Sequence, residues 1–529
     1  MQIFNGTIIT CDADNNVFQY LVEEKGKIVF VGNELPQKYA DCKNIVTLGD
    51  RVVVPSFGDG HIHFSNWATI AMEYFDIRTS RNFSEFGEII KTFVKERKGK
   101  IGKVLAGYGA SPHSLEEKRF PTKVELDSYF SEKPMVIFCY DGHSLLANSK
   151  MIEKFPKEVR ESRGFNEETG LLISEAFYLG LDYATSLFSP ITLMKSMINA
   201  YDLLAKYGVG LIRSVESIGF PMDLDVTLAI MIGKARAKKN NIQTRMFFQT
   251  MDVSKVLKRK LPRIGGCFEA ALDGAFAACD AALTKPYKND PNNKGILVYS
   301  DEKVIDFVKE ANRAELQVEL HTIGDAAINQ AIDAIEKALQ DYPREDHRHS
   351  LIHASLISDE NIRKCAELGI SITMQPAIPV SPLEPISFLE ETIGDRVYAS
   401  SPYRKIVEAG IHLSGGSDGP VTHPNPIDGI YGACNHPYDP SQSLTIQEAL
   451  KMYTYEVAWM SFEEKRRGSL EKGKLADMVI LNENPLNKDP KDLLELQVEQ
   501  LYLKGKKYKP GMRLGNMLWN AMRARKEAI

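Results

Sequence analysis

The sequence lacks the features that mark membrane, secreted or nucleic-acid-binding proteins. None of its apolar runs approaches the roughly 20 residues that a membrane-spanning helix needs. The N-terminal residues have no charged leader, sustained apolar core or small-residue cleavage site. There is no long basic block, and a net charge of -5 is small for 529 residues. We therefore expect a cytoplasmic protein that acts on a small molecule, with neither nucleic acid nor a membrane as partner.

Cysteine is also sparse. The seven cysteines are odd in number and form no Cys-x-x-Cys pair, so we expect them to be reduced and mostly buried. This pattern argues against a structural zinc site, because such sites are closed and usually rich in cysteine. Hydrophobic residues (43%) and charged residues (26%) occur in ordinary proportions for a globular protein. A chain of 529 residues exceeds what one core usually supports, so a large and a smaller domain are expected.

The two ends of the sequence alternate apolar and polar residues as β-strands do. This alternation is present at residues 3–10, 18–22 and 27–32, and again at 473–481 and 498–508. It predicts a small β-sandwich domain built from residues 1–53 and 466–529, which enclose a larger domain at 54–465. Residues 512–529 have the pattern of a helix that docks on the chain itself or on another subunit. A homodimer is the favoured assembly.

The middle of the chain contains eight candidate strands, most of them followed by helix-like sequence. The strands lie at residues 51–63, 210–216, 244–250, 266–272, 316–321, 350–353, 370–375 and 411–418. Strands that alternate with helices predict parallel β/α units, and eight of them predict an α/β barrel. About 145 residues separate the first two strands, far more than an ordinary connection. We interpret residues 65–200 as a folded insertion above the barrel mouth that forms a substrate pocket or a lid.

Polar residues stand at the ends of several of these strands. His61 and His63 are two apart on a strand, so their side chains point to one face. His321 and His353 each end an apolar strand, and Asp418 follows a glycine-rich strand end. The carboxyl ends of parallel barrel strands meet at one mouth, where such enzymes keep their active sites. Because imidazole is the commonest metal ligand, the sequence predicts a divalent metal ion there.

These motifs resemble the amidohydrolase superfamily, and within it the amidohydrolase-3 branch that contains N-substituted formamide deformylase and hydrolases of the exoenzyme-regulatory type. The resemblance covers nearly the whole chain. It includes VVPSFGDGHIH at residues 53–63, DGHSLLANS at 141–149, AALTKPY at 281–287, SDGPV at 417–421 and GSLEKGKLADMVIL at 468–481. It implies a metal-dependent (β/α)8 barrel whose ligands are His61, His63, His321, His353 and Asp418. The expected cofactor is zinc or a similar divalent ion, with one or two ions per chain.

The resemblance also implies a bridging ligand on the fourth strand, where the superfamily usually has a carboxylated lysine. Counting back from Asp273 places Glu269 at this position, and a glutamate carboxylate would bridge two ions directly. In the alternative interpretation, Glu269 is a buried strand residue held by an arginine or by backbone donors. The site would then bind a single ion, with the ligands His61, His63, His321 and Asp418.

Further roles follow from position and from the resemblance. Asp418 is expected to act as general base and then general acid. Asp325 either orients His321 from the second coordination shell or caps the following helix. His143 is expected to bind substrate or to stabilise the oxyanion, unless it only stabilises a turn. Glu175 is expected in the substrate pocket.

The favoured reaction is hydrolysis of a non-peptide C–N bond in an N-acyl or N-formyl amide, by hydroxide that a metal ion activates. A deaminase or lactonase reaction would use the same residues. A non-catalytic regulatory protein that retains the barrel is the third alternative, although a chain without activity has no need of so many competent ligand side chains.

Overall fold

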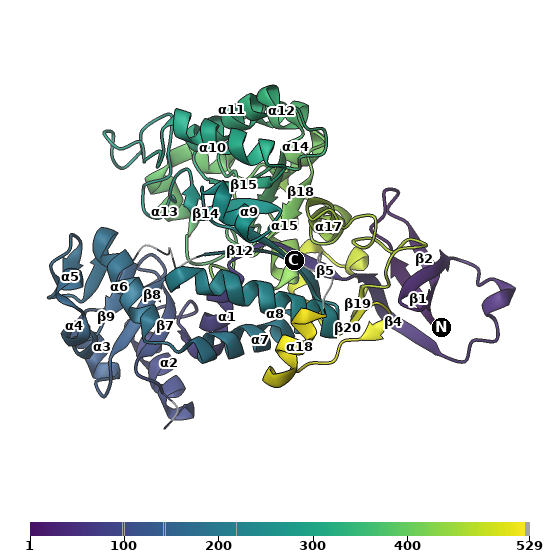
Figure 1. Ribbon diagram of the computed structural model, residues 1–529, viewed down its shortest axis with the longest axis horizontal. Helices are drawn as coiled ribbons and strands as arrows, with labels where there is room; N and C mark the ends of the chain where they lie inside the picture. Colours follow the sequence, from purple (N-terminus) through teal and green to yellow (C-terminus); the bar gives the residue numbers. More distant parts are fainter. Residues whose placement is uncertain (98, 100, 141, 143, 218–219, 524–529) are drawn as a thin grey trace.

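The computed structural model describes residues 1–97, 99, 101–140, 142, 144–217 and 220–523, and its strands form three sheets. An eight-stranded parallel sheet makes the barrel, a seven-stranded sheet combines both ends of the chain, and a six-stranded sheet belongs to the insertion. The terminal sheet and the insertion lie at opposite ends of the molecule, with the barrel between them (Figure 1). The predicted α/β barrel with a separate β-domain from both termini is confirmed.

The barrel strands follow one another around the ring in chain order. They are β5 (Phe57–Ile62), β12 (Val209–Glu216), β13 (Gln243–Phe248), β14 (Arg263–Ala271), β15 (Gln317–Thr322), β16 (Ser350–His353), β17 (Ser371–Met374) and β18 (Leu413–Gly415). All neighbouring strands are parallel, and a bridge between Ile62 and Gly419 joins the segment after β18 to the first strand. Strand residues are almost all buried, because side chains fill the interior and helices cover the outside.

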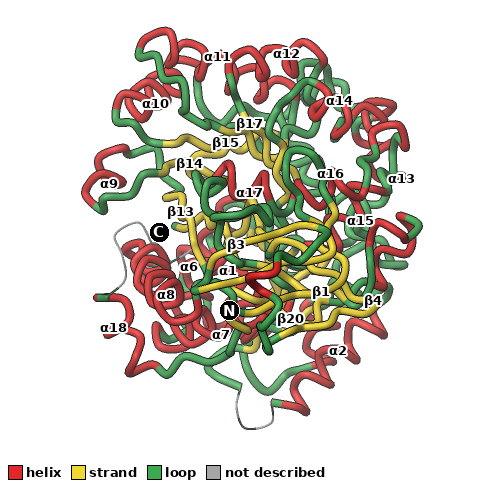
Figure 2. Tube along the Cα trace, turned by 90° about the vertical axis from the view of Figure 1, so that its right-hand side faces the viewer, coloured by secondary structure: helices red, strands yellow, loops and turns green. Residues whose placement is uncertain are grey.

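Helices cover the outer surface of the barrel, as Figure 2 shows for α9 to α12 around strands β14 and β15. The helices that follow the second and later barrel strands are α8 (Leu224–Asn240), α9 (Val253–Lys258), α10 (Asp301–Arg313), α11 (Asp325–Asp341), α12 (Asp359–Leu368), α13 (Ile386–Thr392), α14 (Tyr403–Glu408), α15 (Pro426–Cys434), α16 (Ile446–Met452) and α17 (Tyr455–Met460). Helix α10 illustrates the local signals. The Ser300 side chain caps its first turn, which carries Asp301, and Arg313 ends it.

The predicted strand at residues 51–63 is divided between two sheets. Strand β4 (Ile45–Pro55) belongs to the terminal sheet, and β5 begins two residues later in the barrel. Proline ends a strand well because it has no backbone N–H to donate to a ladder. The chain therefore passes from one domain to the other at Ser56, and His61 stands near the end of a strand that lies wholly inside the barrel.

The terminal sheet takes strands from both ends of the chain in the order β21-β20-β19-β4-β1-β2-β3. Apart from β4, they are β1 (Gln2–Ile9), β2 (Val17–Glu24), β3 (Lys27–Gly32), β19 (Met478–Leu481), β20 (Val498–Leu503) and β21 (Lys506–Lys507). Strand β4 pairs with β1 on one side and with β19 on the other, which joins the two ends. Phe4 and Tyr502 meet edge to face in its core, with ring centroids 5.2 Å apart.

The insertion after β5 has its own sheet and two apolar cores. Its strands are β6 (Phe75–Asp76), β7 (Leu105–Ala110), β8 (Met135–Cys139), β9 (Ser144–Ala147), β10 (Phe165–Asn166) and β11 (Leu171–Ile173). Its helices are α2 (Phe83–Glu96), α3 (Lys123–Tyr129), α4 (Ser149–Lys154), α5 (Lys157–Arg160) and α6 (Ser174–Ser186). Helices α1 (Phe64–Glu73) and α7 (Pro190–Lys206), which pack on each other, connect it to the barrel. The described part of the insertion thus has a sheet and apolar cores of its own.

The C-terminal helix α18 (Leu514–Met522) packs against α8 on the outside of the barrel (Figure 1). Met517 is buried there, whereas Leu518, Trp519 and Met522 are exposed. Among the described helices, none combines the length and the apolar composition needed to cross a membrane.

Candidate metal centre

Six polar side chains from five barrel strands converge at the carboxyl end of the barrel. They are His61 of β5, His63 just after it, Cys267 of β14, His321 of β15, His353 at the end of β16 and Asp418 just after β18. The ligand atoms of the histidines and the cysteine form two overlapping groups, His61, His63 and Cys267 and then Cys267, His321 and His353, each with all its atoms within 4.8 Å of one another. The five residues predicted at strand ends are therefore brought together, and a cysteine joins them.

The Asp418 carboxylate lies against the first two histidines. Its Oδ1 is 3.3 Å from His61 Nε2 and 3.2 Å from His63 Nε2, and it has no ordinary hydrogen-bond donor among the described residues. Burial alone would raise the pKa of Asp418, but the two imidazoles hold it well below its ordinary value. Burial lowers the pKa of His63, whereas at His61 the effect of Asp418 outweighs burial and raises the pKa. The carboxylate stays ionised at neutral pH.

Cys267 links the two groups of ligand atoms. Its Sγ is 3.5 Å from His61 Nε2, and it belongs both to the group with His61 and His63 and to the group with His321 and His353. Burial raises the pKa of the Cys267 thiol well above its ordinary value, and the nearby Asp418 carboxylate adds to the effect. A bound cation reverses this balance, since a coordinating thiol loses its proton.

Glu269, the expected bridging ligand, lies outside the cluster in the structure. This side chain is exposed, accepts a hydrogen bond from Thr250 Oγ1 at 3.2 Å and does not belong to either group of ligand atoms. The physical reason is an irregularity in β14. Phe268 has a φ of 56°, and the pairing register with β15 shifts between Gly266 and Ala271. This bulge breaks the simple alternation of the strand, so the inward position falls on Cys267.

The two histidines of the second group are held by neighbours outside the cluster. His353 Nδ1 is 2.6 Å from Gln375 Oε1, which directs Nε2 toward the cluster. Burial lowers the pKa of His353 to about 3, and His321 contributes, so its imidazole is neutral at pH 7. His321 Nδ1 lies 3.4 Å from Asp273 Oδ1. Asp273 is fully buried and is fixed by three backbone N–H groups, those of Ala282, Ile323 and Gly324.

Asp325 does not have the predicted contact with His321. It is the first residue of α11, after the N-cap Gly324, and its carboxylate accepts hydrogen bonds from the backbone N–H and the hydroxyl of Thr284. Asp273, which follows the neighbouring strand β14, takes the orienting position. Adjacency along the chain was a poor guide, because the helix start turns Asp325 away from the strand end.

The loop that carries Asp418 is fixed from below by Asp59. The Asp59 carboxylate accepts hydrogen bonds from Ser417 N at 3.0 Å, from Ser417 Oγ at 2.6 Å and from His61 N at 3.1 Å. Burial raises the pKa of Asp59 to about 6, against the opposing effect of Ser417. One carboxylate therefore ties the histidine motif of β5 to the loop after β18.

The insertion holds the same loop from above. Arg78 Nη1 donates to the carbonyl oxygens of Pro420 at 2.7 Å and of Val421 at 3.2 Å. Asp76 pairs with Arg78 at 2.6 Å, and the guanidinium lies over the Tyr108 ring. The residues after Asp418 are thus attached to the folded insertion by a charged hydrogen-bond donor.

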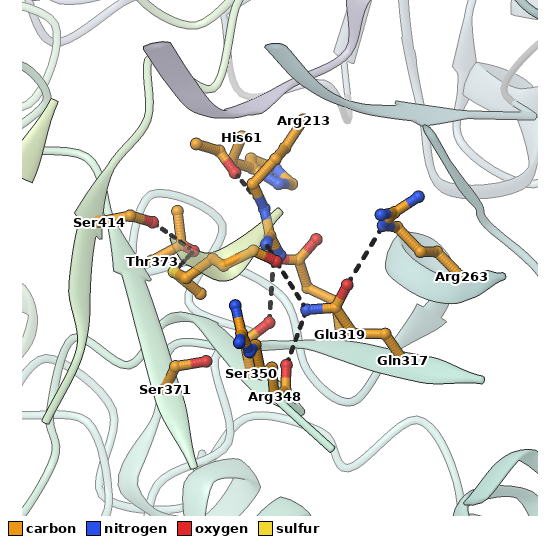
Figure 3. A network of polar contacts seen from close by, with 12 residues as sticks. His61, Arg213, Arg263, Gln317, Glu319, Arg348, Ser350, Ser371, Thr373 and Ser414 are labelled. Carbon is orange, nitrogen blue, oxygen red and sulfur yellow. Dashed lines mark hydrogen bonds and ion pairs between the residues drawn. The ribbon is translucent and has the colours of Figure 1, made fainter. Parts of the chain in front are cut away.

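Deeper in the barrel, a network of buried ionic and polar groups lies beneath the cluster (Figure 3). Arg213 donates to Glu319 Oε1 at 2.8 Å, to the carbonyl oxygen of Met460 at 2.5 Å and to that of Gly60 at 3.2 Å. Ser350 Oγ donates to Glu319 Oε1 at 3.1 Å. Arg213 and Glu319 have no exposed side-chain surface. This network supports β5 one residue before His61.

The cluster opens into a cavity of about 470 Å³. The insertion supplies one wall, and loops after the barrel strands supply the other. The aromatic lining residues are Tyr74, Tyr108, Phe138, Tyr140, Phe177, Tyr178, Phe220, Phe268 and Phe276. This size suits a small organic molecule, and the position of the insertion above the mouth agrees with its predicted part in a substrate pocket.

The profile of the amidohydrolase family matches residues 44–507 of the chain, from the terminal sheet through the whole barrel. The chain belongs to the amidohydrolase family. Its fold and its cluster of histidines at the barrel mouth are therefore those of a metal-dependent hydrolase.

Similar amidohydrolases are known from several organisms. The amidohydrolase YtcJ of Bacillus subtilis is 26% identical, over 94% of this chain and 97% of its own. The N-substituted formamide deformylase of Arthrobacter pascens is 24% identical, over 96% and 97%. Among solved structures, a metal-dependent hydrolase of Pyrococcus horikoshii is 25% identical with a TM-score of 0.74, over 92% of this chain and 99% of its own.

The other predicted pocket residues have different outcomes. Glu175 is exposed, accepts a hydrogen bond from Arg163 N at 3.2 Å and does not line the cavity, because the inner face of α6 presents Phe177 and Tyr178 instead. Glu175 therefore lies outside the cavity lining, and its part in substrate binding stays a prediction. His143 lies outside the described residues.

Sequence reasoning missed Cys267, Asp273, Gln375 and Arg78. Only Cys267 has a recognisable signal in the sequence, the two glycines that precede it. Gly265 is required there because a Cβ at this position would lie 2.0 Å from the Glu319 carbonyl oxygen. Such close backbone approach is typical of an active centre.

Proposed function

We propose that this metal-dependent hydrolase cleaves a non-peptide C–N bond in an N-acyl or N-formyl amide, with two divalent ions of the zinc type. The observation that carries the proposal is the position of Cys267 between two groups of imidazoles beside a cavity. One amide bond and one water molecule give a carboxylic acid and an amine. The relative from Arthrobacter pascens, which is named for the deformylation of N-substituted formamides, supports this choice of bond.

The donor set fits two such ions. His61, His63 and Asp418 would hold one, and His321 and His353 would hold the other. Cys267 would contribute to both, in the place that Glu269 was expected to take. Imidazole, thiolate and carboxylate are the usual zinc ligands. When bound, a divalent ion of this kind lowers the pKa of a water ligand to about 7 and polarises the acyl oxygen.

Asp418 is the residue that moves protons. Its carboxylate is ionised at neutral pH and lies at the cavity wall. It accepts a proton from the attacking water and delivers that proton to the leaving nitrogen, so that the amine departs uncharged. Asp59 and Arg78 hold the loop on which Asp418 stands, which keeps the carboxylate aimed at the same point through both transfers.

The test is metal content per chain in matched variants, measured by elemental analysis. Cys267→Ala should reduce the content from about two ions to about one and lower activity by at least about 100-fold. Glu269→Ala, two residues away on the same strand, is the control and should retain the metal content of the wild type. Loss of metal in Glu269→Ala with retention in Cys267→Ala would reverse the assignment of the bridging ligand.

Activity is tested by formate or carboxylate release from N-formyl and N-acyl amines, using zinc-loaded protein. Release of ammonia from aminated rings, or hydrolysis of lactones with no amide cleavage, would overturn the choice of bond while leaving the family assignment intact.

A further inference from the structure

One buried arginine differs from all the other buried arginines that the structure describes. Six arginine side chains are buried, namely Arg213, Arg236, Arg245, Arg263, Arg348 and Arg467. Five of them have a carboxylate oxygen within 3.0 Å. Arg263 is the exception, because its guanidinium group forms no ion pair with a carboxylate of the described residues although the residue is only 6% exposed.

Arg263 is the first residue of β14 and therefore lies at the amino end of the barrel, away from the metal centre. Its Nε donates a hydrogen bond to Gln317 Oε1 at 3.2 Å (Figure 3). Its Nη1 is buried and has no hydrogen-bond partner among the described residues. A buried donor without an acceptor is costly, and a buried charge without a partner is costlier still.

Two buried carboxylates act on Arg263 from a distance, but each is held by another arginine. Glu319 pairs with Arg213 at 2.8 Å, and Glu463 pairs with Arg245 at 2.5 Å. Burial, together with the Arg245 and Arg213 guanidinium groups, lowers the pKa of Arg263 well below its ordinary value. A guanidinium group nevertheless keeps its proton in proteins. The charge of Arg263 is therefore present and needs an anion from elsewhere.

The guanidinium group of Arg263 borders a second pocket of the molecule, with a volume of about 370 Å³. The residues that line it are Pro262, Arg263, Glu315, Gln317, Arg344, Asp346 and Phe462. They belong to the segments before β14, β15 and β16 and to the segment after α17. Several of them are exposed, among them Pro262, Glu315 and Asp346, so the pocket is open to a solute from outside the barrel.

A second arginine lines the same pocket. Arg344 donates to the carbonyl oxygens of Leu316 at 2.9 Å and of Glu315 at 3.2 Å, and it forms no ion pair with a described carboxylate. Of the two acidic residues in the lining, Asp346 is already paired with Arg348 at 2.6 Å. The other, Glu315, has an exposed side chain. The pocket thus combines two guanidinium groups that lack ion pairs with one exposed carboxylate.

We propose that this pocket binds a small oxyanion, a carboxylate or a phosphate, through the Arg263 guanidinium group, with Arg344 as a second positive charge in the wall. Planar guanidinium groups offer paired N–H donors that match the two oxygens of such anions. Cys267 lies further along β14 toward the mouth, so this site is separate from the metal centre. The inference does not depend on which bond the enzyme cleaves.

Binding is measured by titration calorimetry of zinc-loaded protein with sodium phosphate and with sodium acetate, using sodium chloride at the same ionic strength as the reference. Arg263→Met should weaken binding at this site at least about 10-fold, because a charge-assisted hydrogen bond is lost. An anion that coordinates at the metal centre would bind wild type and variant alike and can be subtracted. The stronger of the two ligands identifies the oxyanion. Equal binding by both proteins, or no binding of either anion to the wild type, would overturn the proposal.

Thermal unfolding gives a second measurement that requires no assumption about affinity. In low-salt buffer, Arg263→Met should unfold at the temperature of the wild type or above it, since an unpaired buried charge is replaced by an apolar side chain. Saturating phosphate or acetate should raise the midpoint of the wild type by about 2–4 °C more than that of Arg263→Met. Arg313→Met, which removes one exposed positive charge outside the pocket, is the control and should respond as the wild type does.

Glu315 offers the competing explanation, in which its own carboxylate turns inward and neutralises Arg263. If the pocket binds an oxyanion, Glu315→Gln removes a repelling charge and should tighten phosphate or acetate binding by about threefold. If Glu315 is the natural partner, Glu315→Gln should lower the unfolding midpoint in anion-free buffer, and the wild type should not respond to added anions. That second pair of results would refute the site.

Discussion

The two ends of the barrel interior hold buried charge in opposite ways. At the amino end, arginines face carboxylates: Arg213 pairs with Glu319 at 2.8 Å and Arg245 with Glu463 at 2.5 Å, all four almost fully buried. At the carboxyl end, the Asp418 carboxylate lies against two imidazoles, 3.3 Å from His61 Nε2 and 3.2 Å from His63 Nε2. The first end pairs these charges within the protein. The second gathers imidazole, thiol and carboxylate groups, which are the ligands that a divalent cation takes. The two ends of one set of strands therefore serve stability and chemistry separately.

The largest expected effect comes from removing the carboxylate at the mouth. Asp418→Asn keeps the shape of the side chain but removes its negative charge, so it loses the proton acceptor and weakens a metal ligand. We expect kcat/KM for amide hydrolysis to fall at least about 1000-fold. Thermal unfolding of the metal-free protein measures separately the stability that the contact of Asp418 with His61 and His63 contributes. A large loss of stability with activity retained in the folded fraction would contradict this division of roles.

The second prediction concerns the buried ion pair at the amino end of the barrel. Arg213→Met leaves Glu319 buried without its cationic partner, and we expect a loss of about 3–5 kcal/mol of unfolding free energy, measured by denaturant titration. The matched double variant Arg213→Met with Glu319→Met should recover much of this loss, because a buried pair replaced by apolar side chains is often neutral. Metal content per folded chain should stay that of the wild type. Equal stability of the single and double variants would show that the ion pair has no such role.

The smallest effect concerns Glu216, a buried carboxylate at the mouth side that accepts hydrogen bonds from two hydroxyl groups. Burial, together with Asp225, raises its pKa to about 8, and the Ser65 and Ser214 hydroxyls donate to it. Because the folded-state pKa lies above the unfolded one, stability is greatest below about pH 4.5 and is lost as pH rises through 8. Glu216→Gln should therefore stabilise the protein increasingly from pH 5 to 8, by about 1–2 kcal/mol.

Thermal melts across this pH range check the expectation, with the exposed Glu175→Gln as control. A difference between Glu216→Gln and wild type that is independent of pH would mean that Glu216 is ionised in the folded protein throughout.

The parts of the fold that repeat a local rule could be predicted from the sequence. Apolar runs followed by helical patterns located the barrel strands within a few residues, and His321 and His353 were found because each ends such a run. The alternating segments at both ends of the chain located the terminal sheet for the same reason. These features depend on the periodic spacing of apolar residues, which can be recognised in a single sequence.

The remaining parts depend on contacts between distant segments or on a single irregular residue. Glu269 was placed in the site by counting along a regular strand, and the left-handed conformation of Phe268 moved the position to Cys267. Asp273 and Gln375 orient histidines on neighbouring strands, and nothing in the intervening sequence records that contact. The aromatic cavity is likewise assembled from the insertion and from several loops, so its charge could not be read from one segment.

The attachment of Arg78 to the loop after Asp418 has a consequence for regulation of the reaction. A substituent that packs against Tyr108 presses on the ring behind which Arg78 lies, and Arg78 holds the carbonyls of Pro420 and Val421. Under the proposed function, recognition in the insertion and proton transfer in the barrel are therefore coupled equilibria. Such coupling is reciprocal. If a bound substituent orders this loop, then a correctly placed Asp418 increases the affinity for that substituent by the same free energy.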